Sequence, residues 1–241
     1  MSDLIWNFSS LVLGTGFGAL LAFEFERWQR RREERNDHYL AAKYAHFALI
    51  QQYSLLRNLA AQHLTSLADN ENRWWILHPI QSPPQSFSID FSSLAFVLRS
   101  QDPDLLNRLA VTQDRFSTLM RLLDQRSDLH AQFQERMALL QREGAFTGGM
   151  FALDQETATI IGPHLLAQLR QTTDLLFEGV PEAQEFITAR LKELEDFVRK
   201  EFPKERAPRY QELPLNEGTA ANPADRADGN RKQRGSRRSS A

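Results

Sequence analysis

A hydrophobic repeat with a period of 3.5 residues, running from Leu105 to Leu140, is the feature that most restricts the fold of this 241-residue chain. The repeat alternates steps of four and three residues through five heptads, which is typical of a helix that packs one face in a coiled coil or bundle. Asp102 and Pro103 form a helix start before it, and Gly144 provides a stop after it. The spacing therefore predicts one helix about 60 Å long. Its seam positions are Leu105, Leu109, Thr112, Phe116, Leu119, Leu123, Arg126, His130, Phe133, Met137 and Leu140.

Residues 24–67 contain neither Gly nor Pro and carry a stripe of apolar residues at helical spacing, which Leu40, Tyr44 and Phe47 widen. They predict a continuous helical stalk. Residues 68–90 contain several prolines, which remove backbone donors and disfavour helix before them, so this stretch is expected to be a loop. We expect its Trp pair, Trp74 and Trp75, to act as a hydrophobic plug against the helices.

Two further helices are expected after Gly144. One covers 154–177, where Pro163 either kinks the helix or separates two segments. Gly179, Val180 and Pro181 then predict a boundary before a last helix that ends at Pro203. No stretch shows the alternation of a strand, so the predicted class is all-α, with an antiparallel helical bundle or coiled coil. The seam of the last helix is Ile187, Leu191, Leu194 and Val198.

The twenty residues from Leu4 to Phe23 carry no formal charge, and a helix of this length is about 30 Å long, close to the thickness of a bilayer hydrocarbon core. Trp6 and Trp28 lie near its two ends, where aromatic rings anchor at membrane interfaces. A cleaved signal peptide needs a basic segment before the apolar stretch, and a buried core helix fits poorly with the basic cluster after it. We therefore predict a single transmembrane helix. The cluster that follows consists of Arg27, Arg30, Arg31, Arg32 and Arg35.

This arginine cluster also predicts orientation, because basic residues near a span stay on the cytoplasmic side. No Lys or Arg precedes the span. We expect the N-terminus outside and the C-terminal domain in the cytoplasm, with the lipid bilayer of the inner (cytoplasmic) membrane as the first partner.

Four small residues recur every fourth position within the predicted span, on one face of the helix: Ser10, Gly14, Gly18 and Ala22. Small residues let two membrane helices approach closely and gain van der Waals contact. The pattern predicts self-association through this face, although Gly is also simply common in membrane helices. Both interpretations stay open at this point.

Residues 204–241 are poor in large apolar residues and rich in Pro, Asn, Gly, Arg and Ser, so a disordered tail is expected. Nine Lys or Arg and five Asp or Glu give this tail a net charge of 9 − 5 = +4, although the whole chain has −2. Anionic lipid or nucleic acid are the partners such a tail would contact, unless it is only solvated. Its terminal basic residues are Arg231, Lys232, Arg234, Arg237 and Arg238.

Motifs for catalysis are scarce. The chain has no Cys, which excludes thiolate chemistry and Cys-ligated metals, and it contains no metal or cofactor motif, so we expect neither a metal nor a cofactor. The remaining constellation is Arg126 and His130, one helical turn apart in the seam. They predict either a polar layer that fixes helix register or a pair that holds phosphate and transfers protons, as in a nuclease.

The sequence thus favours a membrane-anchored cytosolic scaffold or interaction protein rather than an enzyme. We expect it to form a homo-oligomer through its membrane helix and its coiled-coil seam and to bind an unknown cytosolic protein. The alternative is a membrane-tethered helical enzyme or stress effector that uses Arg126 and His130. The predicted domains are the anchor 1–26, the juxtamembrane stalk 27–67, the loop 68–90, the long-helix bundle 91–203 and the tail 204–241.

Overall fold

The structure is a computed structural model that describes residues 2–82, 87–142, 155–205 and 208, and only the backbone of 2–17, 155 and 156. The chain divides into the unit Met1–Arg209 and the unit Tyr210–Ala241. The second unit, with most of the predicted disordered tail, lies outside the described residues. All regular elements in the described ranges are helical, which confirms the all-α class.

The elements follow one another with short connections. They are α1 (Ser2–Leu59), continued by a π-helical turn (Ala60–Leu64) and a 3-10 turn (Thr65–Leu67), then α2 (Arg73–Ile76), a 3-10 helix (Ala95–Arg99), α3 (Asp104–Arg142), α4 (Gln155–Ile161) and α5 (Pro163–Glu201).

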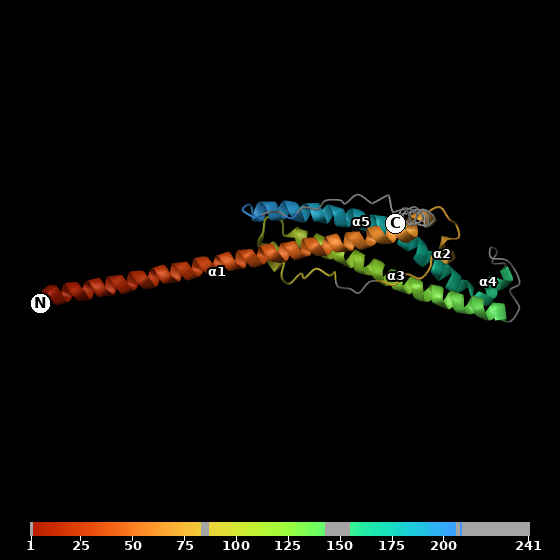
Figure 1. Cartoon of the computed structure of the whole chain (residues 1–241), viewed down its shortest axis with the longest axis horizontal. Coiled ribbons are helices and arrows are strands. Elements are labelled where there is room, and N and C mark those ends of the chain that lie inside the picture. Colours follow the sequence, from red (N-terminus) through yellow and green to blue (C-terminus); the bar gives the residue numbers. More distant parts are fainter. Residues whose placement is uncertain (1, 83–86, 143–154, 206–207, 209–241) are drawn as a thin grey trace, which may run out of the picture. The chain divides into compact units, whose positions relative to one another are not determined.

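Helix α5 is the common partner of the other two long helices, α1 and α3, and all three lie side by side (Figure 1). It runs antiparallel to both. Arg108, early in α3, is 2.9 Å from Glu193 late in α5, and Arg35 of α1 donates to the carbonyl oxygen of Glu201 at 3.2 Å. The fold is therefore built around the last helix rather than around the first.

The predicted 3.5-residue seam is buried within the chain. Its helix is observed as α3, and every seam position is buried except Met137, which is half-buried. These side chains pack mainly against α5, whose own predicted seam from Ile187 to Val198 is also buried. The seam therefore holds one chain together, and its apolar side chains do not form an open surface for assembly.

The predicted boundary at Gly179, Val180 and Pro181 is wrong, because α5 continues through it. A proline inside a helix costs about 3 kcal/mol, since its missing N–H removes a hydrogen bond. Leu176 and Val180, both fully buried here, contribute roughly 1.5–3 kcal/mol each when withdrawn from water. Burial of this flank against α3 outweighs the local cost, and α5 changes direction in its middle part instead of ending (Figure 1).

At Pro163 the chain does separate into two helical segments, one of the two outcomes expected. Gly162 lies between α4 and α5 with φ of 100°, a conformation that side chains other than Gly rarely adopt. Pro163 then occupies the first turn of α5, where the missing N–H removes no helical hydrogen bond.

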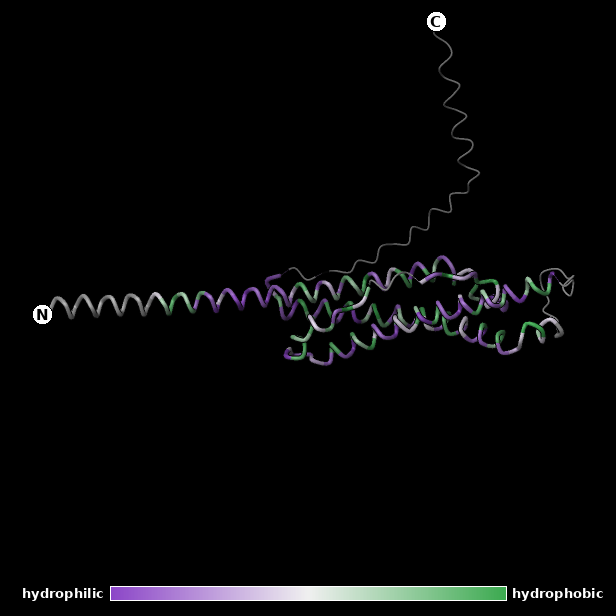
Figure 2. The backbone as a smooth tube through the Cα atoms, turned by 90° about the horizontal axis from the view of Figure 1, so that it is seen from below, coloured by the Kyte–Doolittle hydropathy of each residue, from purple (hydrophilic) through white to green (hydrophobic). Residues whose placement is uncertain are grey.

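Helix α1 has two halves with different surroundings. Residues 18–37 are exposed on all sides, whereas from His38 onward one face is buried, with Ala42, Ala45 and Leu49 at most 3% exposed. Figure 2 shows the exposed half as a hydrophobic end followed by a hydrophilic stretch that leads into the bundle. The stripe expected at the start of the bundle is narrower than predicted, since Leu40, Tyr44 and Phe47 are exposed.

In the ranges whose side chains are described, no helix has a stretch long and apolar enough to cross a membrane. Most of the predicted span, including Trp6, Ser10 and Gly14, lies outside those ranges, since only the backbone of residues 2–17 is described.

Candidate functional site

Arg126, in the middle of α3, has a fully buried side chain. Its guanidinium donates from Nε to Thr173 Oγ1 at 3.2 Å and from Nη1 to the carbonyl oxygen of His78 at 3.1 Å. Nη2 donates to the carbonyl oxygen of Trp74 at 3.2 Å and also to that of Leu77. One side chain thus binds α5 and the loop around α2 to α3.

Burial lowers the pKa of Arg126 to about 10, because a charged group loses its hydration inside the protein. This value is still far above neutral pH, so the guanidinium stays protonated. Among the described residues it has no carboxylate partner. The partial negative charges of three carbonyl groups stabilise it instead, and their own hydrogen-bonding capacity is met in return.

His130, one turn later on α3, is also buried and points to the same loop. Its Nε2 lies 3.0 Å from the carbonyl oxygen of Trp75, which requires Nε2 to carry the proton and donate it. Burial lowers the pKa of His130, the hydrogen bond to Trp75 opposes this shift, and the nearby charge of Arg126 lowers the pKa further. The ring is therefore neutral at pH 7, and Nδ1 has no partner among the described residues.

This geometry favours the polar-layer interpretation of the pair. A phosphate-binding arginine needs free donors that face solvent, whereas the donors of Arg126 are already engaged with backbone carbonyls and a hydroxyl. A proton-transferring histidine needs reach to a substrate, and His130 is 2% exposed. Both side chains hold the loop in place.

Neighbouring polar residues extend the same attachment and were missed in the sequence. Ser127 Oγ accepts from the backbone N–H of Ile80 at 3.1 Å, and Asp124 accepts from the N–H of Ser82 at 3.4 Å. Thr173 on α5 was missed as well. None of these residues carries a sequence signal, because their partners are backbone groups of an irregular loop.

A second buried polar layer joins α1 to α3. Gln52 of α1, fully buried, donates from Nε2 to Gln113 Oε1 at 2.7 Å and to the carbonyl oxygen of Phe87 at 2.6 Å. Gln113 also accepts from the N–H of Ile89 at 3.1 Å. The only signal for this layer is a polar residue next to the buried stripe of each helix.

The Trp pair packs as expected for a hydrophobic plug. Trp74 is 5% exposed and meets Phe133 edge to face at a ring-centroid distance of 5.8 Å. Trp75 is half-buried against the same core cluster. The buried members of this cluster are Trp74, Leu129, Phe133, Leu140, Ile161, Leu165, Leu166 and Leu169.

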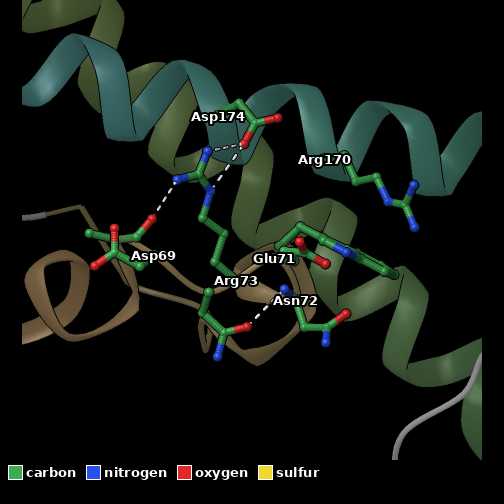
Figure 3. Close-up of a pocket in the computed structure, with 9 residues that line it drawn as sticks. Asp69, Glu71, Asn72, Arg73, Arg170 and Asp174 are labelled. Carbon is green, nitrogen blue, oxygen red and sulfur yellow. Dashed lines mark hydrogen bonds and ion pairs between the residues drawn. The ribbon is translucent and has the colours of Figure 1, made fainter.

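An open cleft of about 520 Å³ lies beside the plug, between the loop 68–74 and α5. Figure 3 shows Arg73 reaching from the loop to Asp174 on α5, where the ion pair measures 2.6 Å. Arg170 lies with its guanidinium carbon 4.7 Å from the centre of the Trp74 ring. Acidic and basic groups alternate in the lining, so the cleft has no dominant charge for an anion or a cation. In the described part of the chain no group of residues could hold a metal ion.

The remaining predicted residues fall into two sets. Trp28, Gly18, Ala22 and the arginine cluster are exposed on α1. Within the cluster, Arg32 lies over the Trp28 ring at 5.6 Å and Arg35 over Phe202 at 5.9 Å. The residues outside the described side chains are Trp6, Ser10, Gly14, Arg231, Lys232, Arg234, Arg237 and Arg238.

Comparison with known protein families, with curated proteins and with solved structures gives no match, so the function has to be inferred from the residues and helices described above.

Proposed function

We propose that this protein is a membrane-anchored scaffold whose helical bundle lies in the cytoplasm and presents surfaces for protein–protein contact. The observation that carries the proposal is the exposed first half of α1. Leu20, Leu21 and Phe23 are each at least 58% exposed, on a helix that continues without interruption into the bundle. Apolar side chains of this size need a cover, and they directly follow the uncharged stretch from residue 4. A bilayer is the cover that suits both.

The residues after this apolar end support the orientation. Phe25 and Trp28 are more than half exposed, and five arginines accompany them. Aromatic rings and arginines side by side are typical of a membrane interface on the cytoplasmic side. The bundle that begins near His38 would then stand one to two helical turns beyond that interface.

The character of the buried polar residues favours a scaffold over an enzyme. Arg126, His130, Gln52 and Gln113 join helices and loops to one another. The described cleft beside α5 is open and mixed in charge. A cytosolic protein partner and self-association remain parts of this proposal, and anionic lipid or nucleic acid at the C-terminal tail stays a sequence-based prediction.

The absence of Cys makes the anchor testable by single-cysteine labelling of the full-length chain. Cysteine at Ser2 should react with a membrane-impermeant maleimide in intact cells with a permeabilised outer envelope. Cysteine at Thr118, exposed on α3, should react only after lysis. The protein should also stay in the membrane pellet after alkaline extraction. Recovery in the supernatant, or equal labelling at both positions before lysis, would refute the anchor.

A further inference from the structure

One face of α1 remains uncovered where the helix joins the bundle. Leu40, Tyr44 and Phe47 are 37%, 71% and 58% exposed, although residues next to them such as Ala41 and Ala45 are buried against the bundle. Steps of four and three residues place all three side chains on one side of the helix. We refer to Leu40, Tyr44 and Phe47 as the outer face of α1.

The continuity of α1 relates this outer face to the membrane end of the helix. Ala22 precedes Leu40 by 40 − 22 = 18 residues, which is about five full turns of 3.6 residues, so the two lie on the same side. Gly18 lies roughly 40° away by the same count. In the exposed half of α1, no Cβ added at Gly18 would meet another atom within 4 Å. The small-residue side and the outer face therefore form one line along the helix.

The line between them carries Glu26, Gln29, Glu33 and Asn36, all exposed. The two acidic groups are already engaged inside α1. Glu26 pairs with Arg30 at 2.5 Å, and Glu33 accepts from Gln29 at 3.0 Å. This stretch is polar without presenting two uncompensated negative charges to a neighbour.

Arg32 and Asp37 flank the line on opposite sides. They are five residues apart, roughly 140° around the helix, so they lie too far apart to pair within one α1. Both are exposed. In a parallel pair of helices, residues at this spacing on either side of the seam meet across the interface, Arg32 of one copy with Asp37 of the other, and the reverse. The flanking charges are thus complementary to a second copy of the same helix.

We propose that the outer face of α1 packs against the outer face of α1 in a second copy of this chain, in parallel. The inference rests on the proposed membrane anchor, because a shared membrane forces two copies to run in the same direction. The charge pattern selects the second copy over a different partner, since it is self-complementary about a two-fold axis along the helix. Tyr44 and Phe47 supply the large apolar contacts that such an interface needs.

The test uses single-cysteine variants of the full-length chain in native membranes, oxidised and analysed without reductant. Leu40→Cys, Tyr44→Cys and Phe47→Cys should give disulfide-linked dimers. Arg31→Cys, half a turn away from the face, and Arg121→Cys, exposed on α3, are the matched controls and should stay monomeric. Equal cross-linking at Arg31 and Leu40, or no dimer in any variant recovered in membranes, would overturn the interface.

Charge exchange tests the register. In the Leu40→Cys chain, Arg32→Asp should lower the dimer fraction several-fold, because two Asp then face each other. Adding Asp37→Arg should restore it. A double variant that cross-links no better than Arg32→Asp alone would exclude the parallel register. A chain recovered in the soluble fraction refutes the anchor itself, whereas a membrane-bound chain without dimers refutes only this interface.

Discussion

Arg126 Nη1 lies 3.1 Å from the carbonyl oxygen of His78, forty-eight positions earlier in the chain, so a residue in the middle of α3 fixes a loop that follows α1. Neither partner could have been chosen from local sequence alone. The loop is held by its backbone, which means that its own side chains are free to differ without loss of this contact.

We expect Arg126→Met to lower the free energy of unfolding by about 2–4 kcal/mol. The substitution keeps much of the apolar volume but leaves the carbonyl groups of Trp74 and Leu77 without their donor in a buried place. Denaturation followed by Trp fluorescence measures the change next to the loop. Arg121→Met, exposed on the same helix, is the control and should stay within about 0.5 kcal/mol of wild type. A loss no larger than that of the control would contradict the role of Arg126.

Stability should fall as the pH is lowered from about 7 towards 5. Burial lowers the pKa of His46 despite the hydrogen bond and charge of Glu195, and burial likewise lowers the pKa of His130. The unfolded chain then binds protons more readily than the folded one, so the free energy of unfolding decreases once the pH drops below the ordinary histidine pKa of about 6.5.

The variant His130→Gln separates one contribution to this pH dependence. Its amide can still donate to the carbonyl oxygen of Trp75 but does not titrate. Urea unfolding at a series of pH values should show a shallower slope in this variant than in wild type. An unchanged slope would mean that His130 is not among the groups that take up protons on unfolding.

Gly179→Ala should destabilise the protein by about 1 kcal/mol, although Ala is the better helix former. A Cβ at this position would lie 2.7 Å from Leu119 Cδ2, so α3 and α5 approach too closely for it. With Leu119→Ala as background the clash is gone, and the same substitution should become stabilising by about 1 kcal/mol. A double-mutant cycle without this change of sign would show that the close approach is not limiting.

Pro181→Ala should stabilise the protein by about 1–2 kcal/mol. The new N–H completes the helix, and the gain exceeds the smaller loss from a less restricted unfolded chain. Pro181 is exposed, so no packing is lost. Pro163→Ala is the control, because a proline in the first turn removes no helical hydrogen bond. Equal thermal shifts in the two variants would contradict this account.

The sequence predicts α3 well because the residues that mark its seam are the same ones that meet α5. It also places Arg126 and His130 in a polar layer, since both occupy seam positions. It does not reveal what they bind, because carbonyl oxygens of Trp74, Trp75 and Leu77 have no side-chain signature. Proximity of α2 to α3 depends on the fold as a whole.

The error at Pro181 has the opposite origin. The local rule that proline ends a helix is sound, and here burial of the flanking residues against α3 is stronger. Leu40, Tyr44 and Phe47 teach a related lesson. Apolar spacing identifies a helix face, but it cannot tell whether the partner belongs to the same chain.

The central place of α5 has a consequence for synthesis. Both α1 and α3 leave the ribosome before the helix that covers them, so Ala42, Leu49 and Leu109 stay in contact with water until residues 187–198 appear. We expect the bundle to form in a single late step rather than piece by piece. Nascent chains arrested before residue 187 should be degraded rapidly by protease along α3, and chains extended past 205 should resist it. The last helix therefore decides when the protein becomes folded.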